Sequence, residues 1–106
     1  MTVVLRFEFD EGVSAEEIRD LAAVAETATE GITGPTALRL EQPLQMYEDE
    51  RAVEIDDASE AGKALARVFS RLAERGVGAM DFRVSRVRRP DGGLGGGDGR
   101  WGSLAG

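Results

Sequence analysis

The order of hydrophobic periodicities constrains the fold of this chain more than any other feature. Apolar side chains first alternate with polar ones, then recur at helical spacing, and then alternate again. This order occurs twice, first in 3–9, 18–28 and 38–41, and then in 53–55, 61–72 and 80–84. The pattern therefore predicts two strand–helix–strand units in succession.

Two such units form the split βαβ arrangement of a ferredoxin-like sandwich. We expect an α+β domain with one four-stranded antiparallel sheet and two helices on one face. An alternative is another small α+β arrangement in which the third strand pairs differently. The domain should span residues 1–89, and residues 90–106 form a glycine-rich C-terminal tail that we expect to be disordered or to become ordered on a partner.

Several short signals place the ends of the elements. Ser14 and Glu17 have the spacing of a capping box, and Gly34–Pro35 should end the helix that follows. Asp57 is predicted to cap the second helix by the same logic. We expect the second strand at 38–42, just before Pro43, and an irregular connection at 43–50.

The alternation also predicts which side chains lie on the face of the sheet away from the helices. Such a mixed-charge face is compatible with solvent, and it is compatible with a second copy of the chain. Aromatic side chains, which RNA-binding sheets use to stack bases, fall on the opposite phase, so we do not expect nucleic acid here. The predicted residues are Arg6, Glu8, Arg39, Glu41, Glu54, Asp81, Arg83 and Ser85.

The composition excludes several classes of site. The chain has no cysteine and no histidine, so thiolate chemistry, zinc–thiolate sites and imidazole bases are absent. The acidic residues in 48–57 lack the spacing of a calcium loop, and we expect no cofactor or metal. The N-terminal apolar run is too short for a membrane span, which favours a cytoplasmic protein.

The charge is unevenly distributed along the chain. The net charge is −7, with fifteen acids and four bases in residues 1–57 and five acids and nine bases in residues 58–106. Such asymmetry is compatible with a solvated surface, and it also supports self-association. We expect a homo-oligomer on this ground.

An arginine cluster stands at the end of the fourth predicted strand. Its guanidinium groups could bind a phosphate or an acidic segment of a partner protein, because they pair bidentately with both. They could equally balance the acidic N-terminal half or protect a strand end. The cluster consists of Arg83, Arg86, Arg88 and Arg89.

The tail carries the only tryptophan, Trp101, between Arg100 and a terminal Leu104 segment. Three interpretations remain open: Trp101 packs on its own domain, anchors a partner-docking motif with Leu104, or belongs to a loading peptide. The segment from Gly102 to Gly106 resembles the loading peptides of encapsulin cargo proteins, which implies a compartment cargo. Trp101 stands where those peptides have isoleucine or leucine, and their lysine is missing here.

The whole pattern over 3–88 is also similar to small ferredoxin-like oxygenases and isomerases, some of which use no cofactor. That resemblance implies a pocket between sheet and helices, and Tyr47 beside Met46 is the place to look for one. We nevertheless expect a non-catalytic accessory module that self-associates and docks a partner protein through its sheet face and tail. A cofactor-free enzyme or ligand-binding domain is the alternative, and a compartment cargo or nucleic-acid accessory protein is a further one.

Overall fold

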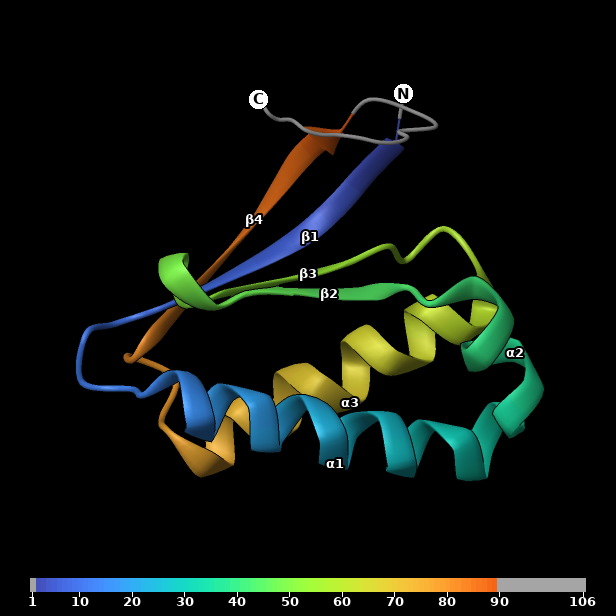
Figure 1. Cartoon of the computed structure of the whole chain (residues 1–106), viewed down its shortest axis with the longest axis horizontal. Coiled ribbons are helices and arrows are strands. Elements are labelled where there is room, and N and C mark those ends of the chain that lie inside the picture. The colour runs from blue at the N-terminus through green and yellow to red at the C-terminus, as the bar shows by residue number, and fades with distance from the viewer. Residues whose placement is uncertain (1, 90–106) are drawn as a thin grey trace.

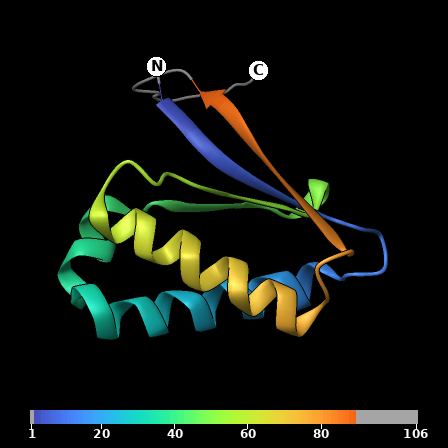
Figure 2. The ribbon, with the colours of Figure 1, turned by 180° about the vertical axis from the view of Figure 1, so that it is seen from behind.

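The computed structural model describes residues 2–89 as an α+β fold with one four-stranded antiparallel sheet and three α-helices. The helices form one layer under the sheet, as Figure 1 and the reverse view in Figure 2 show. The elements are β1 (Thr2–Phe9), α1 (Ala15–Thr33), α2 (Pro35–Glu41), β2 (Leu44–Tyr47), the 3-10 turn η1 (Glu48–Glu50), β3 (Ala52–Ile55), α3 (Glu60–Gly76) and β4 (Phe82–Arg89).

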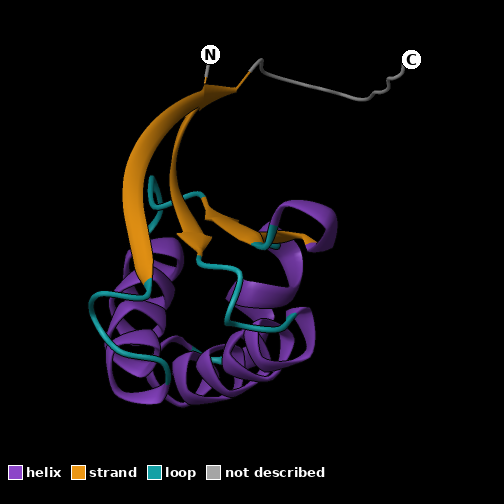
Figure 3. Cartoon of the chain, turned by 90° about the vertical axis from the view of Figure 1, so that its left-hand side faces the viewer, coloured by secondary structure: helices purple, strands orange, loops and turns teal. Residues whose placement is uncertain are grey.

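The strands lie in the order β2-β3-β1-β4, so β1 is hydrogen-bonded on both sides. Phe7 of β1 stands opposite Val53 of β3 and opposite Val84 of β4. The eight-residue strands β1 and β4 pair along their whole length, from Thr2–Arg89 to Phe9–Phe82. Figure 3 shows that this long pair curves up and away from the helices.

The core lies between the sheet and the helices. Phe69 of α3 contacts Phe7 edge-to-face, with ring centroids 4.9 Å apart. Ile18 of α1 and Leu65 of α3 are fully buried beside them. Burial of a large apolar side chain stabilises a fold by roughly 1.5–3 kcal/mol, so this aromatic and aliphatic cluster supplies much of the free energy of folding.

The predicted start and end of the first helix are confirmed. The Ser14 hydroxyl accepts a hydrogen bond from the Glu17 backbone at 3.1 Å, and the Glu17 carboxylate accepts one from the Ser14 backbone. Gly34 follows the helix with φ +89°, a conformation that glycine adopts without steric cost. The chain can therefore turn sharply there into α2.

The predicted second strand at 38–42 is wrong, because these residues belong to the helix α2. Pro35 is placed at the start of this helix, where its fixed φ is favourable and its missing N–H is not needed. Leu38 faces the core, whereas Leu40 is 79% exposed. Two leucines two positions apart fit a strand face, but here the helix buries one of them alone.

The strand β2 lies instead inside the segment 43–50, which we predicted to be a connection. Leu44 pairs with Ile55, and Tyr47 pairs with Ala52. Leu44 and Met46 of β2 pack against the core, and Gln45 and Tyr47 face the other way, but none of the four residues is fully buried. Pairing with β3, whose four residues are all buried, places it in the sheet.

The predicted cap of α3 also needs correction, because Ser59 and not Asp57 begins this helix. The Ser59 hydroxyl accepts a hydrogen bond from the Gly62 backbone at 3.0 Å. A Cβ at Gly62 would lie 2.0 Å from the Asp56 carbonyl oxygen, so only glycine allows the helix to approach the end of β3 this closely. Asp57 is left to pair with β4.

Candidate functional site

The side of the sheet that no helix covers is the candidate site, and we call it the helix-free face. The register places alternate residues of each strand there, because their neighbours point into the core. Figure 3 shows that the helices cover only one side of the sheet. It consists of Thr2, Val4, Arg6, Glu8, Gln45, Tyr47, Ala52, Glu54, Arg83, Ser85, Val87 and Arg89.

Arg6 stands at the centre of this face and is surrounded by carboxylates. Its guanidinium donates to Glu54 at 2.6 Å and to Glu8 at 2.8 Å, and it also pairs with Glu50 of η1. Arg6 is only 9% exposed although it lies on an open sheet face. Ion pairing therefore fixes the charged centre of the helix-free face.

Glu54 links Arg6 to the outer strand β4. Its carboxylate is 4% exposed and accepts hydrogen bonds from both Arg6 and Arg89, with 2.9 Å from Arg89 Nε to Glu54 Oε1. Burial alone would raise the pKa of Glu54, but the hydrogen bonds from Arg89 and Arg6 outweigh it and hold the pKa below its ordinary value. Glu54 thus stays ionised, and one buried anion binds two cations.

Tyr47 extends the cluster toward β2. Arg6 lies 5.7 Å from the centre of its ring, and the Tyr47 hydroxyl donates to Gln45 Oε1 at 2.9 Å. Burial, followed by the charge of Glu54, raises the pKa of Tyr47 above its ordinary value. A phenol with a raised pKa stays protonated near neutral pH, so Tyr47 is poorly suited to act as a general base.

The four arginines predicted as one cluster lie on two sides of the sheet. Arg83 and Arg89 are on the helix-free face, whereas the register turns Arg86 and Arg88 to the opposite side. Arg86 donates to both oxygens of Asp57, at 3.1 and 3.0 Å. The structure therefore does not bring the four guanidinium groups together around one ligand.

The helix-free face agrees only in part with the residues that alternation predicted for it. Arg6, Glu8, Glu54, Arg83 and Ser85 are there. The other three predicted members are not on this face, because Arg39 and Glu41 lie on the helix α2 and Asp81 precedes β4. The face instead includes Gln45, Tyr47 and Arg89, and Glu50 contacts Arg6 from η1.

The misplaced second strand explains most of this difference. With β2 at 38–42, neither Tyr47 nor the acidic turn η1 could be assigned to the sheet face. The candidate tail residues Arg100, Trp101 and Leu104 lie outside the described residues 2–89.

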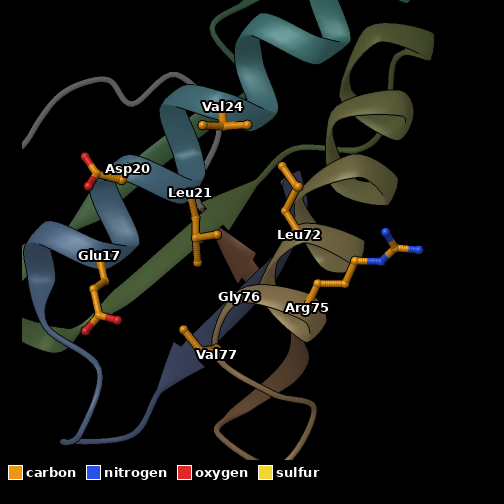
Figure 4. Close-up of a pocket in the computed structure, with 8 residues that line it drawn as sticks. All are labelled: Glu17, Asp20, Leu21, Val24, Leu72, Arg75, Gly76 and Val77. Carbon is orange, nitrogen blue, oxygen red and sulfur yellow. The ribbon is translucent and has the colours of Figure 1, made fainter.

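Two adjoining hollows lie on the helical side of the molecule, the larger between α1 and α3 (Figure 4) and the smaller at the loops before α1 and after α3. The larger has a volume of about 420 Å³ and is lined at its centre by Leu21, Val24, Leu72 and Val77. Neither Tyr47 nor Met46 lines either hollow. Tyr47 lies on the helix-free face, whereas Met46 packs against the core between the sheet and the helices, which is where the oxygenase and isomerase resemblance would require a pocket.

The acidic stretch 48–57 does not converge on one point. Glu48 pairs with Arg19, Glu50 and Glu54 pair with Arg6, and Asp57 pairs with Arg86. Within residues 2–89, no group of three or more carboxylates is arranged to hold a metal ion.

No family model, curated protein or solved structure that was compared with this chain matches it. Among the described helices, none is both long enough and apolar enough to span a membrane.

Proposed function

We propose that this chain is a non-catalytic protein–protein interaction module that associates with a second copy of itself through the helix-free face. The observation that carries the proposal is the layout of charge on that face. Acidic side chains gather at the β2–β3 edge, arginines stand on β4 at the other edge, and buried ion pairs join the two.

The topology supports a ferredoxin-like sandwich as the scaffold of this module. β1 pairs with β3 and β4, β2 pairs with β3, and α1 and α3 each connect strands that are not neighbours. The additional helix α2 is an elaboration of the first connection. A sheet with helices on one side only leaves its other side available for a partner.

The charges on the helix-free face are self-complementary. Glu48, Asp49 and Glu50 of η1 stand on the side of the sheet away from the helices (Figures 1 and 2), and Arg83 lies at the opposite edge. A two-fold axis parallel to the strands would place the arginines of one copy over the acids of the other. Such an isologous contact uses the same patch on both subunits.

Pairing through the free edge of β4 is disfavoured by its composition. This edge strand contains Arg83, Arg86, Arg88 and Arg89 among its eight residues. Two such edges side by side would bring like charges together, which is a common protection against strand addition. The face of the sheet, with charges of both signs, is the better surface for a second copy.

The test is a charge swap followed by mass measurement. Arg83→Glu and Asp49→Lys should each weaken self-association, because each places like charges opposite each other. We expect the midpoint of dissociation, measured by light scattering over a concentration series, to rise about tenfold or more, which corresponds to about 1.4 kcal/mol. The double variant should recover much of the association.

Arg67→Glu is the matched control, because it reverses the charge of an exposed residue on the helix α3. It should associate as the unaltered chain does. Wild-type chain that stays monomeric at every concentration would contradict the proposal, and so would equal weakening by Arg67→Glu and Arg83→Glu.

A further inference from the structure

The two hollows on the helical side of the molecule differ in chemistry although they adjoin. The larger has the apolar side chains of Leu21, Val24, Leu72 and Val77 toward its centre, as Figure 4 shows. The smaller, of about 250 Å³, is lined by three carboxylate residues, Asp10, Glu17 and Asp81. Glu17, Gly76 and Val77 line both hollows, so the apolar and acidic parts are continuous.

The apolar hollow is an accessible surface. Val24 is 54% exposed, and Leu21 and Leu72 are only partly buried. Its size falls within the range of pockets that hold small ligands or single large side chains. The pair of hollows therefore fits a segment with a large apolar side chain next to a basic one.

This chain contains such a segment outside the described residues. Trp101 is its only tryptophan, and Arg100 directly precedes it. Tryptophan supplies one of the largest apolar areas of any side chain, about 150–250 Å². The same segment contains the acidic Asp98, and the basic Arg75 lines the apolar hollow on its α3 side, so these two residues also have opposite charges.

We propose that the Arg100–Trp101 segment of one copy binds the two hollows of a second copy, with Trp101 in the apolar hollow and Arg100 at the carboxylates. This assignment extends the proposed self-association, because it also requires a second copy, but it does not depend on the sheet-face contact. It uses the helical side of the molecule rather than the sheet face, so the two contacts can coexist.

The length of the tail favours a second copy over the same copy. Arg89 ends β4 at the far end from Phe82, about 23 Å along the strand. The path from Arg89 to the hollows must also pass around the sheet and the helix layer, another 10 Å or more. The twelve residues 90–101 span at most about 40 Å. They would reach their own hollows only in a largely extended conformation, whereas a second copy held by this contact alone can take a position that does not extend the tail.

The single tryptophan makes the test direct, because the emission of Trp101 reports on its surroundings. In the full chain we expect the emission maximum to shift to shorter wavelength as the protein concentration rises. Val24→Lys should abolish this shift, because it places a charge in the apolar hollow. Ile32→Lys is the matched control, since Ile32 is a 67% exposed apolar residue on the same helix and does not line the hollow.

A charge swap tests the acidic part. Asp10→Lys should move the shift to at least tenfold higher concentration, and Asp10→Lys combined with Arg100→Glu should restore much of it. A shift that does not depend on concentration would overturn the assignment to a second copy. Emission that never shifts, or that shifts equally in the Val24→Lys variant, would overturn the site itself.

The same experiment separates this inference from the proposed function. Arg83→Glu weakens the sheet-face contact but leaves the hollows intact, so the emission shift should persist while the mass falls. If Arg83→Glu and Arg67→Glu have the same mass at every concentration while the emission shift is normal, the result would count against the sheet-face contact only. Loss of the emission shift, with a normal response to Arg83→Glu, would count against the hollows only.

Discussion

On the helix-covered face of the sheet, Phe7 is 1% exposed because aromatic and aliphatic side chains from two helices surround it. On the helix-free face, Arg6 is 9% exposed and Glu54 is 4% exposed without any helix over them. Neighbouring residues of one strand are thus buried by different means. The first depends on apolar packing, and the second depends on opposite charges that hold long side chains flat against the sheet.

The difference has consequences for what each face can do. An apolar core tolerates changes of pH and salt, but it loses stability when volume is removed. An ion-paired face gains little net stability, because desolvation offsets the attraction, but it fixes charged groups in defined positions. The helix-free face is therefore suited to recognition, whereas the helix-covered face maintains the fold.

The largest effect should come from removing volume on the helix-covered face. Phe69→Ala deletes a fully buried ring that contacts both Phe7 and Phe9. We expect the free energy of unfolding, measured by urea titration, to fall by about 3–5 kcal/mol. A loss below 1 kcal/mol would show that the aromatic cluster does not dominate the core.

A smaller loss should follow when the centre of the helix-free face is removed. Arg6→Leu leaves the buried Glu54 with Arg89 as its one remaining partner in the cluster. We expect a loss of about 2–3 kcal/mol, because a buried carboxylate loses a charged hydrogen bond. If Arg6→Leu lowers the free energy of unfolding as much as Phe69→Ala does, the two faces contribute equally to stability, and the proposed difference between them is wrong.

Acid should distinguish the two faces next. The pKa of Glu54 is lower in the folded chain than the ordinary value near 4.3, so its stabilising contribution is complete above about pH 4.3 and is lost as the pH falls through the folded pKa. Glu54→Gln should therefore flatten the decline of stability below about pH 4, measured by urea titration at several pH values.

Glu26→Gln is the control with opposite sign. Burial, and then the charge of Glu30, raises the pKa of Glu26 above its ordinary value. Its contribution to stability is present below the unfolded pKa and is lost as the pH rises through the folded one. Removal of this carboxyl should therefore make the free energy of unfolding fall more steeply as the pH is lowered. Equal changes in the two variants would argue against the role of Glu54.

The smallest effect should come from an exposed ion pair. Arg86→Ala removes the bidentate pair with Asp57, in which the arginine side chain is 58% exposed. Because solvent screens this pair, we expect almost no change in the urea midpoint. Arg89→Ala, three residues along the same strand, should have the larger effect, since it leaves the buried Glu54 with one partner fewer. A larger change in the urea midpoint for Arg86→Ala than for Arg89→Ala would mean that burial does not determine how much these ion pairs stabilise the fold.

The parts of the fold that local chemistry specifies were predictable. The capping box of Ser14 and Glu17 and the turn at Gly34 follow from residues within four positions of each other. The core phase of Phe7, Phe9 and Phe82 follows from alternation alone. These features need no knowledge of what the segment packs against.

The candidate site was less predictable, because its contacts join distant segments. Arg89 and Glu54 are thirty-five residues apart, and Arg6 and Glu54 forty-eight. Their pairing depends on the strand order β3-β1-β4. The contacts of Tyr47 and Glu50 with Arg6 depend on the position of β2, which alternation at Leu38 and Leu40 misplaced. A pattern of two leucines cannot distinguish a short strand from a short helix.

The sequence by itself therefore determined the class of fold, the ends of α1 and the aromatic core, because periodicity and capping act over a few residues. It also determined the chemistry that is absent, since a chain without histidine or cysteine cannot supply those groups. Only the tertiary structure decided where β2 lies, which arginines share a face, and which carboxylate is buried between them. Those outcomes depend on the packing of segments far apart in the chain, where the free energy of pairing and burial outweighs local preference.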